Sequence, residues 1–330
     1  MPAFYRKAAA NGVSPVNQHR RKTIMCKFNH LILTQFNVKI ESNAKIKESP
    51  EWLCSRFGLF DRFCYPSMRA QTNQNFRWLV FFDAQTPDIF QERIRSYSRW
   101  GNFIPCYVDS FSNLENHDII NENIAPSSKY LITTRIDNDD AISTTFVDEV
   151  QKNFCGQRFE FINFANGYLL DINNHRLYKK KISSNMFVSL IERIENFKTV
   201  FCGLPSSIVL PPKHGRGQLS LESFRTGKDI TPQNTPWLSH ANLHLVGKIR
   251  EIETEPLWLL VVHGGNLANQ IGISLRVPMQ FLENKFSINY AHDPDRGNFI
   301  VSNMIKKIGL SFPKPMKSLL RKLYFILGRL

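Results

Sequence analysis

The chain has 330 residues, of which 42 are basic and 28 acidic, so its formal net charge is +14. Hydrophobic residues make up 42% and aromatic residues 12%, which is typical of a globular protein and excludes a fibrous or wholly disordered chain. Twelve of the excess positive charges lie in residues 1–25 and 302–330, which hold no acidic residue, and residues 26–301 are left at about +2. A near-neutral middle argues against a basic nucleic-acid-binding face, so we expect no nucleic-acid partner.

This distribution divides the chain into three regions. Residues 1–25 lack hydrophobic periodicity and predict a disordered basic leader, with Met25 as an alternative translation start. Residues 26–301 form the predicted folded domain, and residues 302–330 a basic tail. No apolar run approaches the roughly 20 residues of a transmembrane helix, and no apolar segment of a secretory signal follows the basic start. Together with six scattered cysteines, expected to be reduced and mostly buried, these features predict a cytoplasmic protein.

The first half of the folded region alternates between strand-like and helix-like segments. Short β-rich or apolar runs predict strands at residues 30–40, 77–82, 103–108 and 130–136. Helical spacing of apolar residues predicts helices at residues 51–71, 89–100 and 114–122. The alternation predicts an α/β fold in which a mainly parallel central sheet carries helices on both faces. Ligands of such sheets bind beyond the carboxyl ends of the strands.

The second half of the folded region gives a less regular pattern. A helix is predicted at residues 145–154 and a strand at 159–170. Apolar residues from Phe187 to Phe197 recur at helical spacing and predict a helix at 186–197. Residues 202–236, rich in Pro, Gly, Ser and charge, predict a long surface loop. The apolar run at 257–262 predicts a further strand.

An acidic segment, Asp137-Asn138-Asp139-Asp140, directly follows the strand predicted at 130–136. Neighbouring carboxylates raise one another's pKa, and a bound Mg²⁺ or Mn²⁺ would remove that cost because these cations prefer carboxylate and phosphate oxygens. In the tight turn after a strand, Asp139 and Asp140 can both reach a common ion. The alternative interpretation is a solvated turn that caps the next helix, since Asp and Asn favour both positions.

The acidic segment and its surroundings resemble a known family. The string TTRIDNDDAIS (133–143) follows WLVFFD (78–83) and precedes LWLLVVHGGN (257–266), and further landmarks are LILTQFNV (31–38), FCYPSMRAQ (63–71), NFRW (75–78) and SSNMFVSLIE (183–192). Over roughly residues 28–270 the chain is similar to the putative rhamnosyltransferase family of the GT-A superfamily. Family members carry Arg where this chain has Gln35, a departure that bears on any role of that position in donor binding.

The resemblance implies a glycosyltransferase with a GT-A-like, Rossmann-type sandwich. It implies a nucleoside-diphosphate-sugar donor, with rhamnose as the candidate sugar, and a glycan or lipid-linked acceptor. It also implies a divalent cation, Mn²⁺ or Mg²⁺, held by the carboxylates of the acidic segment. Such an ion bridges the two phosphates of the donor and stabilises the charge that develops on the leaving diphosphate.

The resemblance implies roles in metal and donor binding for the polar residues at the strand ends. Asp139 and Asp140 would hold the metal, and Asp137 would bind the metal or the donor ribose. His263, directly after the strand at 257–262, is a candidate third metal ligand through a neutral imidazole nitrogen, or else a loop histidine that positions the glycines after it. Arg135 lies two residues before Asp137 and would contact the donor diphosphate or pair with an aspartate.

Three further residues are candidates for donor binding and catalysis. Asp83, at the end of the strand at 77–82, would bind the donor base or ribose, or cap the next helix. Asn37 is a second donor-binding candidate. An inverting transfer needs a general base, and we nominate Glu192 on the helix predicted at 186–197, with Glu195 and Glu222 as rivals. The alternative is that Glu192 is a solvent-exposed residue of this helix with no catalytic role.

The basic tail also has a pattern. From Met316 to Leu330 apolar residues recur at helical spacing and basic residues occupy other faces, which predicts an amphipathic helix. Such a helix suits the anionic inner face of the cell membrane, where each basic residue adds about 1 kcal/mol. The alternative is that its apolar stripe packs against the folded domain.

Two other functions compete with sugar transfer. Metal-dependent phosphoryl transferases or hydrolases also use an Asp-x-Asp pair, but Ala141 and the late position of the segment argue against the haloacid dehalogenase type. A non-enzymatic membrane-binding module would not need aspartates at a sheet edge, and the near-neutral middle of the chain argues against it.

Overall fold

The computed structural model describes residues 28–38, 49–109, 117–183, 185–201, 247–263 and 275–290. The leader at 1–25, the loop at 202–236, Glu222 and the tail at 302–330 lie outside the described residues. Within the described part of the chain, no helix has the length and apolar character needed to cross a bilayer. The four described cysteines are free thiols, with Cys64 and Cys106 buried and Cys54 and Cys155 exposed, so only half of them are buried as expected.

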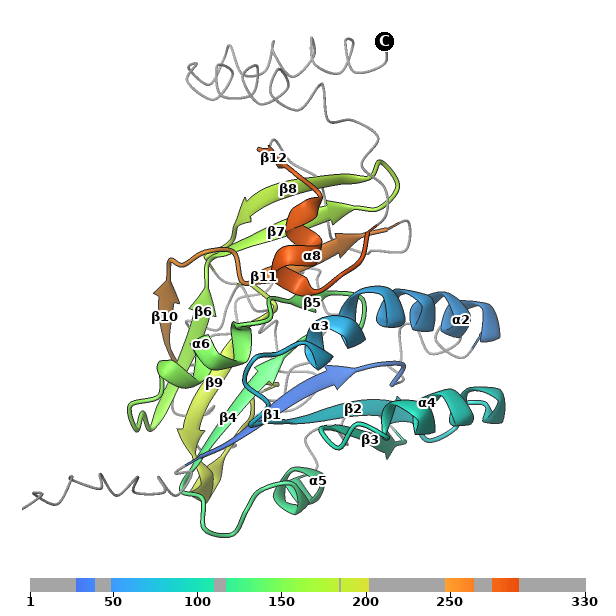
Figure 1. Cartoon of the computed structure of the whole chain (residues 1–330). Coiled ribbons are helices and arrows are strands. Elements are labelled where there is room, and N and C mark those ends of the chain that lie inside the picture. The colour runs from blue at the N-terminus through green and yellow to red at the C-terminus, as the bar shows by residue number, and fades with distance from the viewer. Residues whose placement is uncertain are drawn as a thin grey trace, which may run out of the picture.

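A seven-stranded sheet forms the centre of the described structure (Figure 1). Its spatial order is β10-β6-β9-β4-β1-β2-β3. Its strands are β1 (Phe28–Gln35), β2 (Arg77–Asp83), β3 (Phe103–Val108), β4 (Tyr130–Arg135), β6 (Phe159–Phe164), β9 (Ser189–Arg193) and β10 (Lys248–Ile252). Among these described strands, β9 alone runs against the others, because both of its pairings are antiparallel and those of β1 with β2 and β4 are parallel. The α/β fold with a mainly parallel central sheet is therefore confirmed.

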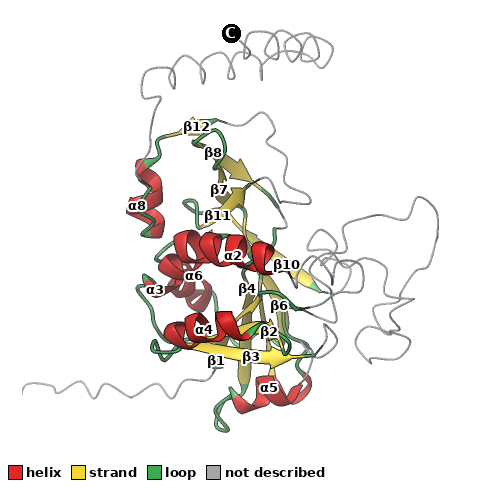
Figure 2. Cartoon of the chain, turned by 90° about the vertical axis from the view of Figure 1, so that its right-hand side faces the viewer, coloured by secondary structure: helices red, strands yellow, loops and turns green. Residues whose placement is uncertain are grey.

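Several helices cover one face of this sheet, as Figure 2 shows, and one described helix packs on the other face. The described helices are α2 (Pro50–Leu59), the π-helix η1 (Phe60–Cys64), α3 (Tyr65–Arg69), the 3-10 helix η2 (Asp88–Phe90), α4 (Gln91–Tyr97), α5 (His117–Glu122), α6 (Phe146–Lys152), the 3-10 helix η4 (Ile194–Asn196) and α8 (Gln280–Phe286). Residues of α2, α3, α4 and α6 pack with alternate strand residues such as Ile32 and Trp78. The intervening residues, such as Leu31 and Leu79, form a second core with Ile120 of α5 and the segment 197–201. The sheet is buried on both faces, which explains its continuous apolar strands.

A smaller, five-stranded sheet lies beside the first and appears above it in Figure 1. Its order is β12-β8-β7-β11-β5. Its strands are β5 (Ala141–Ile142), β7 (Asn166–Asp171), β8 (Arg176–Lys181), β11 (Trp258–Val262) and β12 (Arg276–Val277). Ile136 and the acidic segment 137–140 form the whole connection between β4 of the large sheet and β5 of the small one. This connection places the segment at the junction of the two sheets.

The strand predicted at 159–170 is wrong in one respect: it is two strands in different sheets. β6 ends at Phe164, and after Ala165 the chain continues as β7 in the small sheet. Gly167 permits this change because the indole of Trp258 lies against it, and a Cβ there would be 2.0 Å from the ring. Alternating hydrophobicity reports which residues are buried but cannot report which sheet buries them.

The helix predicted at 186–197 is also wrong. Residues 189–193 form β9, an interior strand between β4 and β6. Because both faces of β9 are buried, Leu190 enters one core and Ile191 the other. An interior strand therefore needs adjacent apolar residues, and in this sequence they happened to coincide with helical spacing.

Candidate active site

The acidic segment is a turn at the carboxyl end of β4. The backbone N–H of Asp140 donates to the carbonyl of Asp137 at 3.3 Å and closes the turn. The side-chain amide of Asn138 is buried and donates to the carbonyl of Phe36 at 2.9 Å. Asn138 thereby ties the turn to the residue that follows β1, so the ends of the two neighbouring strands form one edge.

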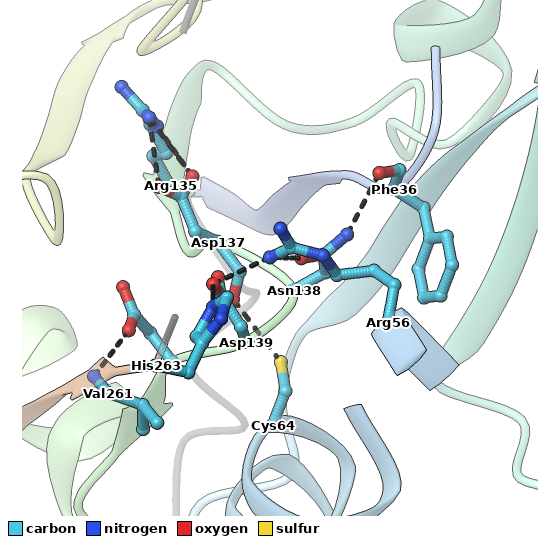
Figure 3. Close-up of polar contacts among 10 residues, drawn as sticks. Phe36, Arg56, Cys64, Arg135, Asp137, Asn138, Asp139, Val261 and His263 are labelled. Atoms are coloured by element: carbon cyan, nitrogen blue, oxygen red, sulfur yellow. Dashed lines mark hydrogen bonds and ion pairs between the residues drawn. The ribbon is translucent and has the colours of Figure 1, made fainter. Parts of the chain in front are cut away.

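Asp139 is the centre of the described polar contacts. Its Oδ2 accepts from Nη1 of Arg56 at 2.6 Å and lies 2.8 Å from Nε2 of His263, and Figure 3 shows both side chains meeting there. The side chains of Asp139, Arg56 and His263 are only 11%, 15% and 10% exposed. Burial by itself would raise the pKa of Asp139, but the hydrogen bond from His263 and the charge of Arg56 outweigh it, and the pKa is lowered. Asp139 is therefore an anion held between two partners.

Asp140 lies deeper and has a different environment. Its Oδ1 accepts a hydrogen bond from the backbone N–H of Val261 at 2.8 Å. Burial, together with the charges of Asp139 and Asp137, raises its pKa well above the ordinary value. Two adjacent carboxyls thus have pKa values pushed in opposite directions. Burial and the two neighbouring carboxylates disfavour the charged form of Asp140, whereas the charge of Asp139 is balanced by Arg56 and His263.

Asp137 pairs with the residue two positions before it. Nε and Nη2 of Arg135 donate to Oδ1 of Asp137 at 3.2 and 3.0 Å, and Nη2 also reaches Oδ2 at 3.2 Å. Of the two interpretations of Arg135, pairing with an aspartate is the one observed. Below the turn, Sγ of Cys64 lies 3.6 Å from the carbonyl of Asp137, and burial followed by the three aspartates raises the pKa of this thiol well above its usual range.

The types of ligand at this turn fit a hard divalent cation, since it offers three carboxylates and an imidazole. Their arrangement is that of an ion-pair network, because each carboxylate already accepts from a protein donor. Within the described ranges, no three His, Cys, Asp or Glu side chains are arranged to hold a metal ion. Binding a cation at this turn would therefore require at least Asp139 to exchange a partner.

Asn37 and Asp83 lie together at the ends of β1 and β2, on the same sheet edge as the acidic turn. Asn37 Oδ1 accepts from the backbone N–H of Asp83 at 3.1 Å, and its Nδ2 donates to Oγ1 of Thr86 at 3.1 Å. Asp83 Oδ1 accepts from the backbone N–H of Gln85 at 2.7 Å. Asp83 therefore shapes the turn after β2. Gln35 donates from Nε2 to the carbonyl of Val38 at 3.2 Å.

Glu192 is not brought to this edge. It pairs with Leu131 at the beginning of β4, six residues before Asp137, which corresponds to about 20 Å along a strand. Its carboxylate is buried and accepts from the backbone N–H groups of Lys198 and Thr199 at 2.8 and 2.9 Å. Burial raises the pKa of Glu192 to about 7. Glu195 follows in η4 at the same far end of the sheet, exposed to solvent.

A cavity of about 370 Å³ also opens at the far end, beside the beginnings of β1 and β2. Two of its polar lining residues, His30 and Asn29, are bonded within the protein. His30 Nε2 lies 2.8 Å from Oγ1 of Thr134, and Asn29 Oδ1 accepts from the backbone N–H of Ala125 at 3.0 Å. Burial lowers the pKa of His30 to about 3, so the imidazole is neutral. These residues support the sheet and are not part of the acidic site.

Arg56 is the residue of this site that the sequence did not reveal. It lies on α2 between Trp52, whose ring its guanidinium covers at 5.0 Å, and the buried Phe57. In the sequence it is one of many basic residues on an exposed-looking helix position. A signal was present in principle, since α2 packs over the edge where the acidic segment was expected, but the facing direction of an arginine cannot be read from spacing.

The fold and this edge define an α/β protein with a polar, carboxylate-rich site at the carboxyl ends of parallel strands, the usual ligand-binding position of such sheets. A family profile described as "Putative rhamnosyl transferase" matches residues 22–200. The match covers more than half of the chain, and the chain belongs to this family of sugar-transferring enzymes. No curated protein matches the chain.

Solved structures of S. aureus TarS are similar to part of the chain. A structure of TarS 1–349 has a TM-score of 0.37 at 9% identity and covers 71% of this chain and 60% of its own. A second TarS structure has a TM-score of 0.36 at 11% identity, covering 72% and 37%. TarS 1–349 in complex with UDP has a TM-score of 0.37 at 10% identity, covering 72% and 60%. The chain thus spans 60% or less of the length of these relatives.

Proposed function

We propose that the protein transfers a sugar from a nucleoside-diphosphate donor to a glycan or lipid-linked acceptor, as a GT-A-type glycosyltransferase. The observation that carries this proposal is the convergence of α2, the turn after β4 and the end of β11 on Asp139. Family membership supports sugar transfer over the phosphoryl-transfer and membrane-module alternatives. The family's description favours rhamnose as the transferred sugar.

The donor would lie along the edge formed by the ends of β1, β2 and β4. Asn37 and Asp83 are proposed to contact its base or ribose, since they are buried polar groups at this edge and are fixed by hydrogen bonds to the backbone and to Thr86. Arg135 and Asp137 are adjacent to them and are proposed to contact the ribose or diphosphate. Preformed polar groups of this kind lower the ordering cost of binding.

We further propose that Asp137, Asp139, Asp140 and His263 hold a Mn²⁺ or Mg²⁺ ion. The proposal is supported by their oxygen and imidazole ligands and by the proximity of Asp140 to the other two carboxylates, which raise its pKa after burial does. Bound there, the ion would stabilise negative charge on the leaving diphosphate. The protein's own contributions are to orient Asp140 through the N–H of Val261, and to fix the turn through Asn138.

Glu192 is not retained as the general base. Its distance from Asp137 and its two backbone hydrogen bonds leave it without access to an acceptor hydroxyl at the proposed site. Glu195 lies at the same far end. Both Glu192 and Glu195 lie near the amino end of β4, away from the acidic turn.

A panel of dTDP-, UDP- and GDP-sugars tests the proposal. With Mn²⁺ present, we expect one nucleotide class to stabilise the protein against heat and to be slowly consumed with release of the nucleoside diphosphate. Asp139→Asn should lose both effects, whereas Asp88→Asn, an exposed residue of η2, should keep them. Release of inorganic phosphate from simple phosphate esters, with no response to any nucleotide sugar, would favour the phosphohydrolase alternative instead.

The basic tail carries a separate proposal about location. From the sequence of residues 302–330, with seven basic and no acidic residues, we propose peripheral attachment to an anionic membrane surface. The full chain should co-sediment with vesicles containing anionic lipid at low salt, and a protein ending at Val301 should not. Equal sedimentation of the two proteins would contradict the proposal.

A further inference from the structure

Arg56 enters the acidic site from α2, and its guanidinium has two kinds of contact. Nη1 donates to Oδ2 of Asp139 at 2.6 Å and lies 3.2 Å from Oδ1 of Asn138. The guanidinium carbon also lies 5.0 Å from the centre of the Trp52 ring, within the range of a cation–π contact. One contact is with an anion, and the other two are with neutral groups that do not depend on Asp139.

The ion pair of Arg56 with Asp139 is well shielded from water. Both side chains are at most 15% exposed, so the attraction between them is only weakly screened. The same oxygen of Asp139 also contacts His263. Any second cation that used this carboxylate would lie close to the guanidinium, and the two positive charges would repel one another in a poorly screened environment.

We propose that Arg56 is an internal counter-ion of Asp139 that competes with a divalent cation for this carboxylate. The inference rests on the proposed function, because it concerns the proposed metal ligands. Arg56 gives up Asp139 when the carboxylate turns to a metal ion, and it keeps Trp52 and Asn138 as partners. These retained contacts make the exchange inexpensive and leave the guanidinium at the donor side of the site. In the absence of metal, Arg56 holds the Asp139 side chain in an ion pair.

Mn²⁺ binding measured by the electron paramagnetic resonance of free Mn²⁺ tests the competition without any need for turnover. We expect Arg56→Gln to bind Mn²⁺ about tenfold more tightly than the wild type, a typical size for coupling between two competing interactions. Arg56→Lys keeps the positive charge and should remain close to the wild type. Asp139→Asn in the Arg56→Gln background should lose the gain.

The chain offers a matched control in Arg93. This arginine of α4 also pairs with an aspartate, Asp61, and lies over an aromatic ring, that of Phe57 at 5.1 Å. Arg93→Gln should leave the affinity for Mn²⁺ unchanged. Unchanged or weaker binding by Arg56→Gln would overturn the competition. If neither the wild type nor Arg56→Gln bound Mn²⁺, the proposed metal site would fall as well. Binding of Mn²⁺ by Arg56→Gln but not by the wild type would support the proposal, because it would show that Arg56 blocks the Asp139 carboxylate.

The proposal can also be tested on the wild-type protein, so that a variant that folds poorly does not decide the outcome. In the nitrogen-15 spectrum of arginine side chains, one resonance should be missing from Arg56→Lys and thereby be assigned. Addition of Mg²⁺ should shift this resonance and speed its hydrogen exchange, because the guanidinium loses its anionic partner. A resonance that keeps its position and exchange rate at saturating Mg²⁺ would overturn the proposal.

Discussion

Asp139 and His263 are 124 positions apart in the chain, and their side chains meet at 2.8 Å. Strand pairing explains the contact. β5 begins two residues after Asp139 and pairs antiparallel with β11, with Ala141 opposite Leu259, so the end of β11 is carried back toward the acidic turn. The site therefore depends on correct assembly of the small sheet, although its carboxylates follow a strand of the large one.

Removing the imidazole tests this relationship. His263→Ala should lower donor turnover by tenfold or more and destabilise the protein by about 2 kcal/mol, the usual range for a hydrogen bond to a charged group. His263→Gln can keep a donor near Asp139 and should retain part of both. Initial rates and urea denaturation measure the two effects. Wild-type behaviour of the Ala variant would show that His263 neither positions Asp139 nor supports it.

Gly167 provides a test of how β7 and β11 pack together in the small sheet. A Cβ at this position would be 2.0 Å from the buried ring of Trp258, so Gly167→Ala should destabilise the protein by about 3 kcal/mol through overpacking. Gly58 on α2 has open space around it, and Gly58→Ala should stabilise the helix by up to about 1 kcal/mol. Chemical denaturation of the two variants should move in opposite directions. A harmless Gly167→Ala would contradict the close packing of β7 and β11.

Strands β1 to β4 of the large sheet could be predicted from the sequence because they are short, rich in apolar residues and separated by helices, whereas β10 was not predicted. The run from Trp78 to Phe82 is an example: it is buried on both faces, as a central parallel strand requires. The acidic segment was also placed correctly, since an apolar strand that ends in four polar residues marks a strand end without reference to the rest of the fold.

Other features needed the tertiary structure. β9 lies between two strands and buries both faces, so its apolar residues could not be distinguished from a helical stripe, and Glu192 was assigned to the wrong environment. The pairing of Arg56 with Asp139 joins residues 83 positions apart. No local pattern specifies such a contact, because it depends on how α2 is oriented over the sheet.

The buried carboxyl of Glu192 should make the stability of the folded protein depend on pH. Burial raises its pKa from 4.5 to about 7, so the folded protein binds this proton more tightly than the unfolded chain does. The stabilisation from protonated Glu192 is complete below pH 4.5 and is lost as the pH rises through 7, a change of about 3 kcal/mol. Glu192→Gln cannot titrate, so the wild type should lose stability relative to this variant between pH 5 and pH 8. Guanidinium denaturation at the two pH values measures the difference. Parallel profiles of the two proteins would contradict the buried position of this carboxyl.

The most direct test of where the protein acts is calorimetric titration with the nucleoside diphosphate of the active donor class, in the presence of Mn²⁺. Wild type and Glu192→Gln should bind with the same affinity, because Glu192 lies at the far end of β4, and Asp139→Asn should bind at least tenfold more weakly, consistent with the loss of more than about 1.4 kcal/mol. Undiminished binding by Asp139→Asn, together with loss of binding in Glu192→Gln, would place the ligand at the opposite end of the sheet and contradict the assignment of the site.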